Sequence, residues 1–206
     1  MPKLKDIFLI TCILSLFLTG CSKQITNPNI SMTPEKKVLL IVAPTGFQDK
    51  EYSDTKKALL EQGFKTKVAS TKLKAKGKFG KELNIDLTLE DIKVDNFEAI
   101  VFIGGPGAEI YKTNKKALDI IVKANDSKKI LGAICIAPTI LAQAGVLKNK
   151  KATVWSSSVD NSTIEFLRQK KAEFVDKPVV VDGNIITGNG PSAAYQFGYE
   201  IGKTIK

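Results

Sequence analysis

Short apolar runs rich in Val, Ile and Leu alternate along the chain with longer segments in which apolar positions recur at helical spacing. Gly, Pro and Asn punctuate the ends of these runs. Strands that alternate with helices in this way form a mostly parallel central sheet with helices on both faces, so the pattern predicts a doubly wound α/β fold. The expected strands are residues 37–43, 64–70, 81–87, 98–103, 129–134, 151–155, 179–181 and 185–187, the last two as a hairpin, and the expected helices are residues 52–62, 113–125, 136–144, 163–171 and 192–204.

Three strand ends are candidates for chemistry, because the site of such a sheet lies at the carboxyl ends of its central strands. They are the segment 47–52, the turn Gly104-Gly105-Pro106-Gly107, and Cys135. Cys135 stands between a strand and a helix-like run, where the first free N–H groups of the helix would favour its thiolate. The position predicts a nucleophile or an oxidation sensor, with a small buried hydrophobe as the alternative.

The glycine-rich turn, residues 104–107, lacks the G-x-G-x-x-G pattern and the downstream acid of a dinucleotide site, so no cofactor is expected. Its exposed backbone N–H groups could form an oxyanion pocket instead. Alternatively, these clustered glycines form only a tight turn without a functional role.

The first residues have the pattern of a targeting segment. Lys3 and Lys5 precede an apolar run at 7–18, and Leu18-Thr19-Gly20-Cys21 resembles a bacterial lipobox. An ordinary secretory signal with an incidental cysteine is the alternative. We therefore expect a signal peptide over 1–21, lipidation at Cys21, a flexible tether over 22–35 and one folded domain over 36–206, anchored to the extracytoplasmic side of a cell membrane.

Cysteine and histidine usage limits the chemistry. Cys12 would leave with the signal and Cys21 would be lipidated, so Cys135 is the one remaining thiol and no intramolecular disulfide is expected. The chain has no histidine. This excludes Cys-His and Ser-His-Asp mechanisms and argues against a metal site, so any acid or base must be a carboxylate, a lysine, a tyrosine or the thiol.

The formal net charge of +10 comes from lysines spread along the chain without interleaved aromatic residues. This distribution argues against nucleic-acid binding. A solvated basic surface near anionic lipid is the simpler interpretation.

Six segments carry recognisable motifs in a fixed order along the chain: residues 38–43, 47–52, 102–107, 133–138, 150–155 and 182–191. Together they resemble the ThiJ/PfpI family of the class I glutamine amidotransferase-like superfamily. The resemblance implies a flavodoxin-like sandwich, a Cys135 held at a strained nucleophile elbow, and a homodimer.

The resemblance also implies site residues. It aligns the family's thiol-bonded glutamate with Glu51, for which a first-turn helix acid is the alternative, while Gln48 stands where some members place an acid. Gly104, Gly105 and the amide of Ile136 match the oxyanion-hole positions. Gln48, Trp155 and Pro138 are expected to line the site.

Two departures from the family narrow the function. Members of the PfpI type carry a histidine where this chain has Ile136, and deglycase-type members carry one where Trp155 stands. A Cys-His protease triad is therefore not expected. A Cys135–Glu51 pair acting on small reactive carbonyl compounds, as in a glyoxalase or deglycase, is the first hypothesis. A non-enzymatic oxidative-stress sensor or chaperone-like protein that uses Cys135 oxidation is the second, and a domain that has lost its chemistry is the third.

Overall fold

The computed structural model of the chain describes residues 35–206. The expected signal peptide, the lipidation site Cys21 and nearly all of the tether lie outside the described residues. Within the described part, no helix is long and apolar enough to cross a membrane.

Seven strands form the central sheet in the order β11-β12-β8-β7-β1-β3-β6. Neighbouring strands are parallel except for the antiparallel hairpin of β11 and β12, which confirms the expected hairpin and the mostly parallel sheet. The strands are β1 (Lys37–Ile41), β3 (Lys65–Ser70), β6 (Leu87–Thr88), β7 (Ala99–Phe102), β8 (Ile130–Ile134), β11 (Val179–Asp182) and β12 (Ile185–Gly188).

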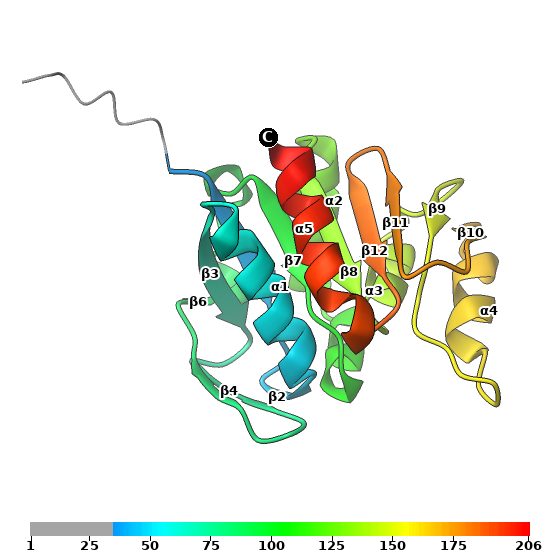
Figure 1. Ribbon diagram of the computed structural model, residues 1–206, viewed down its shortest axis with the longest axis horizontal. Helices are drawn as coiled ribbons and strands as arrows, with labels where there is room; N and C mark the ends of the chain where they lie inside the picture. Colours follow the sequence, from blue (N-terminus) through cyan, green and yellow to red (C-terminus); the bar gives the residue numbers. More distant parts are fainter. Residues whose placement is uncertain (1–34) are drawn as a thin grey trace, which may run out of the picture. The chain divides into compact units, whose positions relative to one another are not determined.

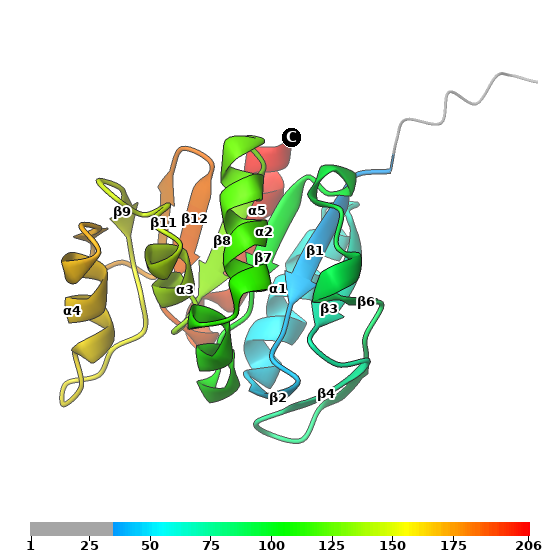
Figure 2. The same cartoon turned by 180° about the vertical axis from the view of Figure 1, so that it is seen from behind.

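Helices cover both faces of this sheet, as Figures 1 and 2 show. One face carries α1 (Asp49–Glu61) and α5 (Ala194–Ile205), and the other carries α2 (Lys115–Asp126) and α3 (Pro138–Gln143). Because helices bury the central strands from both sides, their apolar runs are continuous rather than alternating, and β1 and β7 lie in the core. The predicted α/β fold is therefore confirmed.

Smaller elements surround the sheet. A three-stranded sheet of β2 (Thr45–Phe47), β4 (Lys74–Gly77) and β5 (Glu82–Asn84) lies at the end where the parallel strands finish (Figure 1). A two-stranded sheet of β9 (Lys151–Ala152) and β10 (Glu173–Phe174) lies beyond the β11 edge, together with α4 (Ser162–Gln169) (Figure 1). The 3-10 helices are η1 (Leu89–Asp91), η2 (Val94–Asn96), η3 (Pro106–Lys112) and η4 (Pro191–Ala193).

Two predicted strands are wrong in part. Of the expected strand 151–155 only β9 forms, outside the central sheet, because the amide of Thr153 donates to the Thr187 hydroxyl instead of a strand carbonyl. The expected strand 81–87 is split between β5 and β6. The chain changes sheets at Asp86, whose carboxylate accepts from the amide of Val68 on β3.

Helix α1 begins at Asp49, three positions before the expected start. The Gln48 side chain caps it by accepting from the amide of Lys50 at 3.1 Å. Glu51 therefore lies in the first turn of the helix, at the carboxyl ends of the central strands.

Candidate active site

Cys135 occupies a strained turn between β8 and α3. Its φ is +64°, in the left-handed region that costs a side chain of this kind about 1 kcal/mol or more. Two hydrogen bonds hold this conformation: its amide donates to the Gly188 carbonyl at 2.9 Å, and its carbonyl accepts from the Trp155 amide at 2.8 Å. The turn keeps Cys135 at the floor of a cavity, with 8% of the residue exposed.

Glu51 projects from the first turn of α1 to the same place and is fully buried. Its Oε2 accepts from the Gly104 amide at 3.1 Å, and its carboxyl group lies beside the Cys135 thiol. Its Oε1 finds no hydrogen-bond partner among residues 35–206. A buried carboxyl oxygen without a partner is costly, and it leaves an acceptor free for a proton.

The two groups perturb each other. Burial raises the pKa of Glu51 to about 7, against the opposing effects of Cys135 and the Gly104 amide. Burial, and then the Glu51 charge, raise the pKa of the Cys135 thiol far above its usual range. Once the pair has lost one proton, the remaining proton can sit on either group, so Glu51 can accept the proton of the thiol.

The expected effect of backbone N–H groups in favour of the thiolate is present, but it is too small to set the pKa of Cys135. Helix α3 has only 6 residues, and burial outweighs the amides of Gly105 and Ile136, which pull the thiol pKa downward. Any reactive thiolate at Cys135 must therefore arise by proton transfer within the pair.

The expected oxyanion amides separate into two roles. The Gly104 N–H is already taken by Glu51, so it positions the carboxylate and is not free for a ligand. The N–H groups of Gly105 and Ile136 face the sulfur of Cys135. These two amides are the ones that can stabilise an oxyanion formed next to the sulfur.

The cavity in front of the thiol has a volume of about 270 Å³. Of the three residues expected to line the site, Gln48 and Trp155 line this cavity, whereas Pro138 does not. Pro138 is instead buried as the first residue of α3, where its fixed φ suits the start of a helix. The complete lining consists of Gln48, Lys78, Gly105, Pro106, Cys135, Ile136, Trp155 and Pro191.

Lys78, Pro106 and Pro191 were not predicted as lining residues. Lys78 is contributed by the turn between β4 and β5, a segment whose pattern gives no indication of contact with Cys135. Pro106 and Pro191 adjoin the glycine-rich turn and the start of the last helix, and both belong to segments that carry the family resemblance. That resemblance was the signal that could have identified them.

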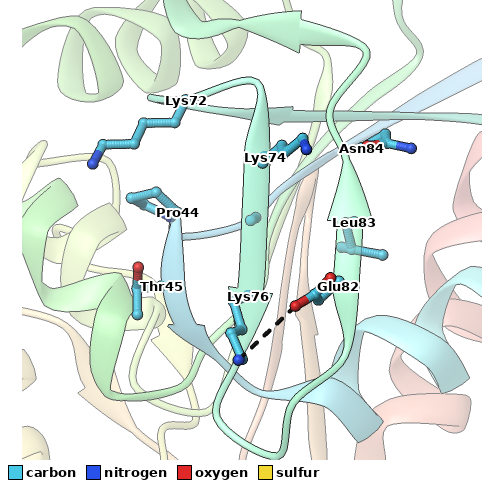
Figure 3. Close-up of a pocket in the computed structure, with 9 residues that line it drawn as sticks. Pro44, Thr45, Lys72, Lys74, Lys76, Glu82, Leu83 and Asn84 are labelled. Atoms are coloured by element: carbon cyan, nitrogen blue, oxygen red, sulfur yellow. Dashed lines mark ion pairs between the residues drawn. The ribbon is translucent and has the colours of Figure 1, made fainter.

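A second cavity, of about 540 Å³, lies over the small sheet, and no cysteine lines it (Figure 3). The amino groups of Lys72 and Lys74 point away from one another, and Lys76 is paired with Glu82 at 3.9 Å. These charges do not converge on one point. No group of three or more metal-ligating side chains gathers anywhere in residues 35–206.

The chain is similar to known proteins in both sequence and fold. Residues 36–204 match the DJ-1/PfpI family. An uncharacterized protein of Methanocaldococcus jannaschii is 36% identical over 98% of both chains, and a deglycase of Thermococcus kodakarensis is 34% identical over 82% of this chain and 99% of its own. The crystal structure of a ThiJ/PfpI domain protein from Brachyspira murdochii has a TM-score of 0.77 and 30% identity, covering 82% of this chain and 95% of the other. The chain therefore belongs to the DJ-1/PfpI family.

Proposed function

We propose that this protein acts on small reactive carbonyl compounds, as a deglycase or glyoxalase does, with Cys135 as nucleophile and Glu51 as the proton-transfer group. The observation that carries the proposal is the contact of the strained Cys135, the one thiol of residues 35–206, with a buried carboxyl group of raised pKa at the floor of a small cavity. Relatives named deglycases, including the Thermococcus kodakarensis protein, support the same activity.

The chemistry begins with transfer of the thiol proton from Cys135 to Glu51. The sulfur then attacks the aldehyde carbon, so that an S–C bond forms while the π electrons of the carbonyl move to its oxygen. The amides of Gly105 and Ile136 stabilise that oxygen until Glu51 returns the proton, which gives a hemithioacetal. No histidine is needed, because the carboxyl group titrates near neutral pH.

With an α-oxoaldehyde the reaction can continue. Glu51 removes the proton of the former aldehyde carbon and returns one to the neighbouring carbon, which converts the hemithioacetal into the thioester of a 2-hydroxy acid. Water then cleaves the S–C bond and restores the thiol. The net reaction adds one water to the α-oxoaldehyde, and the electrons balance without a cofactor.

Cys135→Ser is expected to abolish turnover of methylglyoxal, because a serine hydroxyl is a far weaker nucleophile at neutral pH. Lactate formation by the wild type and the variant measures this directly. Equal rates for the two proteins would refute the proposal. Stoichiometric sulfinate at Cys135 after mild peroxide, without lactate formation, would favour the oxidative-stress sensor instead.

We also propose that a lipid on Cys21 anchors the protein to the extracytoplasmic side of a membrane, on the basis of the lipobox-like residues 18–21. Cys21→Ser is expected to move the protein from the membrane fraction to the soluble fraction and to abolish incorporation of labelled palmitate. Cys135→Ser provides the matched control and should leave both unchanged. Wild-type protein without label would contradict the proposal. The homodimer stays a prediction from the family resemblance.

A further inference from the structure

Lys78 is the only charged side chain that lines the cavity of Cys135 within residues 35–206. The other lining groups are apolar side chains, backbone amides, the Gln48 amide and the thiol itself. Glu51 is buried beside Cys135 and is not part of the cavity wall. A ligand that enters this cavity therefore meets one positive charge and no negative charge on the surrounding side chains.

The backbone of Lys78 is held in place by the turn that carries it. Its amide donates to the Phe47 carbonyl at 2.8 Å, next to the Gln48 cap. The Asp49 carboxylate accepts from the amides of Phe79 at 2.9 Å and Lys81 at 2.8 Å, so it binds the turn to the first residue of α1. The first turn of α1, which carries Glu51, therefore also holds the backbone of Lys78 in place.

The ammonium group of Lys78 is available to a ligand. It lies 5.5 Å from the centroid of the exposed Phe79 ring, and no ion pair within residues 35–206 involves it. By contrast, Lys76 on the same hairpin is paired with Glu82 and lines the other cavity. Lys78 therefore lines the Cys135 cavity without a paired carboxylate, whereas Lys76 has a paired carboxylate and lines a different cavity.

We propose that Lys78 makes the site selective for carbonyl compounds that carry an anionic group, of which an α-oxoaldehyde with a carboxylate, such as 4,5-dioxopentanoate, is the type. The carboxylate pairs with the Lys78 ammonium group at the rim while the aldehyde carbon reaches the sulfur of Cys135. A cavity of about 270 Å³ accommodates a molecule of this size. This selectivity rests on the proposed function for turnover, but binding of the anion does not.

Alkylation of Cys135 by iodoacetate and by iodoacetamide tests the charge without any turnover. In both reactions the sulfur forms a bond to the CH₂ carbon and iodide leaves. The only difference between the reagents is that iodoacetate carries a negatively charged carboxylate and iodoacetamide carries a neutral amide. Rates are measured on the full chain by mass spectrometry of the peptide that contains Cys135. Dividing the two rates removes any change in thiolate fraction, which affects both reagents equally.

Lys78→Met is expected to lower the iodoacetate-to-iodoacetamide rate ratio about tenfold, the effect of one unit charge roughly 4 Å away at an effective dielectric constant of about 60. Lys78→Arg should restore the ratio, and the matched control Lys76→Met should leave it at the wild-type value. An unchanged ratio in Lys78→Met would overturn the proposal. An equal fall in Lys76→Met would also overturn it, because the effect would then belong to the general basic surface.

A second experiment measures turnover of a charged and a neutral substrate. In Lys78→Met, kcat/KM for 4,5-dioxopentanoate is expected to fall about tenfold more than kcat/KM for neutral methylglyoxal, and the difference should lie in KM. If neither compound is turned over by the wild type but the alkylation ratio still depends on Lys78, the proposed reaction fails and the anion site stands. If the wild type turns over these compounds but the alkylation rate ratio is the same in Lys78→Met and the wild type, the proposed anion site is refuted and the proposed reaction is retained.

Discussion

Glu51→Gln is expected to reduce turnover of methylglyoxal by at least about a hundredfold while making the protein more stable at alkaline pH. Turnover falls because an amide cannot accept the thiol proton. Stability rises because the amide is neutral at every pH and its oxygen can still accept from the Gly104 amide. A change that lowers activity and raises stability identifies a residue kept for chemistry rather than for packing.

The pH dependence of this effect follows from the raised pKa of Glu51. The folded protein keeps the carboxyl proton up to about pH 7, whereas the unfolded chain releases it around the ordinary glutamate pKa of 4.5. The neutral carboxyl group therefore contributes fully to stability below about pH 4.5, and this contribution is lost as the pH rises through 7. The shift corresponds to roughly 3 kcal/mol at pH 8, as an upper limit.

Urea unfolding of the wild type and Glu51→Gln at pH 5 and pH 8 measures this difference. The variant should gain stability relative to the wild type at pH 8 and little or nothing at pH 5. Glu61→Gln, an exposed carboxylate near the other end of α1, is the matched control and should follow the wild-type pH dependence. A variant that is less stable than the wild type at pH 8 would contradict the raised pKa.

Gly104→Ala is expected to cost about 2 kcal/mol of stability and about a hundredfold in turnover. A Cβ on Gly104 would lie 2.5 Å from the Cys135 Cβ, 2.6 Å from the Ile134 carbonyl oxygen and 2.8 Å from Glu51 Oε2. The first two contacts involve the strained elbow and its strand, which cannot move away like the end of a flexible side chain. The added methyl group must therefore push Cys135 and Glu51 apart.

Gly63→Ala separates the two effects. Gly63 follows α1 with φ +88°, and a Cβ there would meet nothing within 4 Å, so alanine introduces backbone strain far from the thiol. Both variants should unfold at lower urea concentration than the wild type. Only Gly104→Ala should change methylglyoxal turnover and the iodoacetamide rate at Cys135. Equal turnover in Gly104→Ala and the wild type would show that the site tolerates the extra methyl group.

Local pattern accounts for the part of the fold that was predicted from the sequence. Strands β1, β7 and β8 are continuous apolar runs because both of their faces are buried, and the turn residues at their ends mark where they finish. The predictions failed where a distant partner decides the conformation. The segment 151–155 leaves the strand conformation because of Thr187, and the segment 81–87 changes sheets because of Val68.

By itself, the sequence determined the chemistry that is available: one thiol outside the N-terminal segment, no imidazole, and Cys135 and Glu51 in two of the six segments that carry the family resemblance. Only the tertiary structure decided how these groups interact. Burial sets the direction of both pKa shifts, the Gly104 amide is engaged by Glu51, and a hairpin turn far from Cys135 in the sequence brings Lys78 to the cavity. Solvent exclusion and long-range contacts exist only once the chain has folded, so no local pattern contains them.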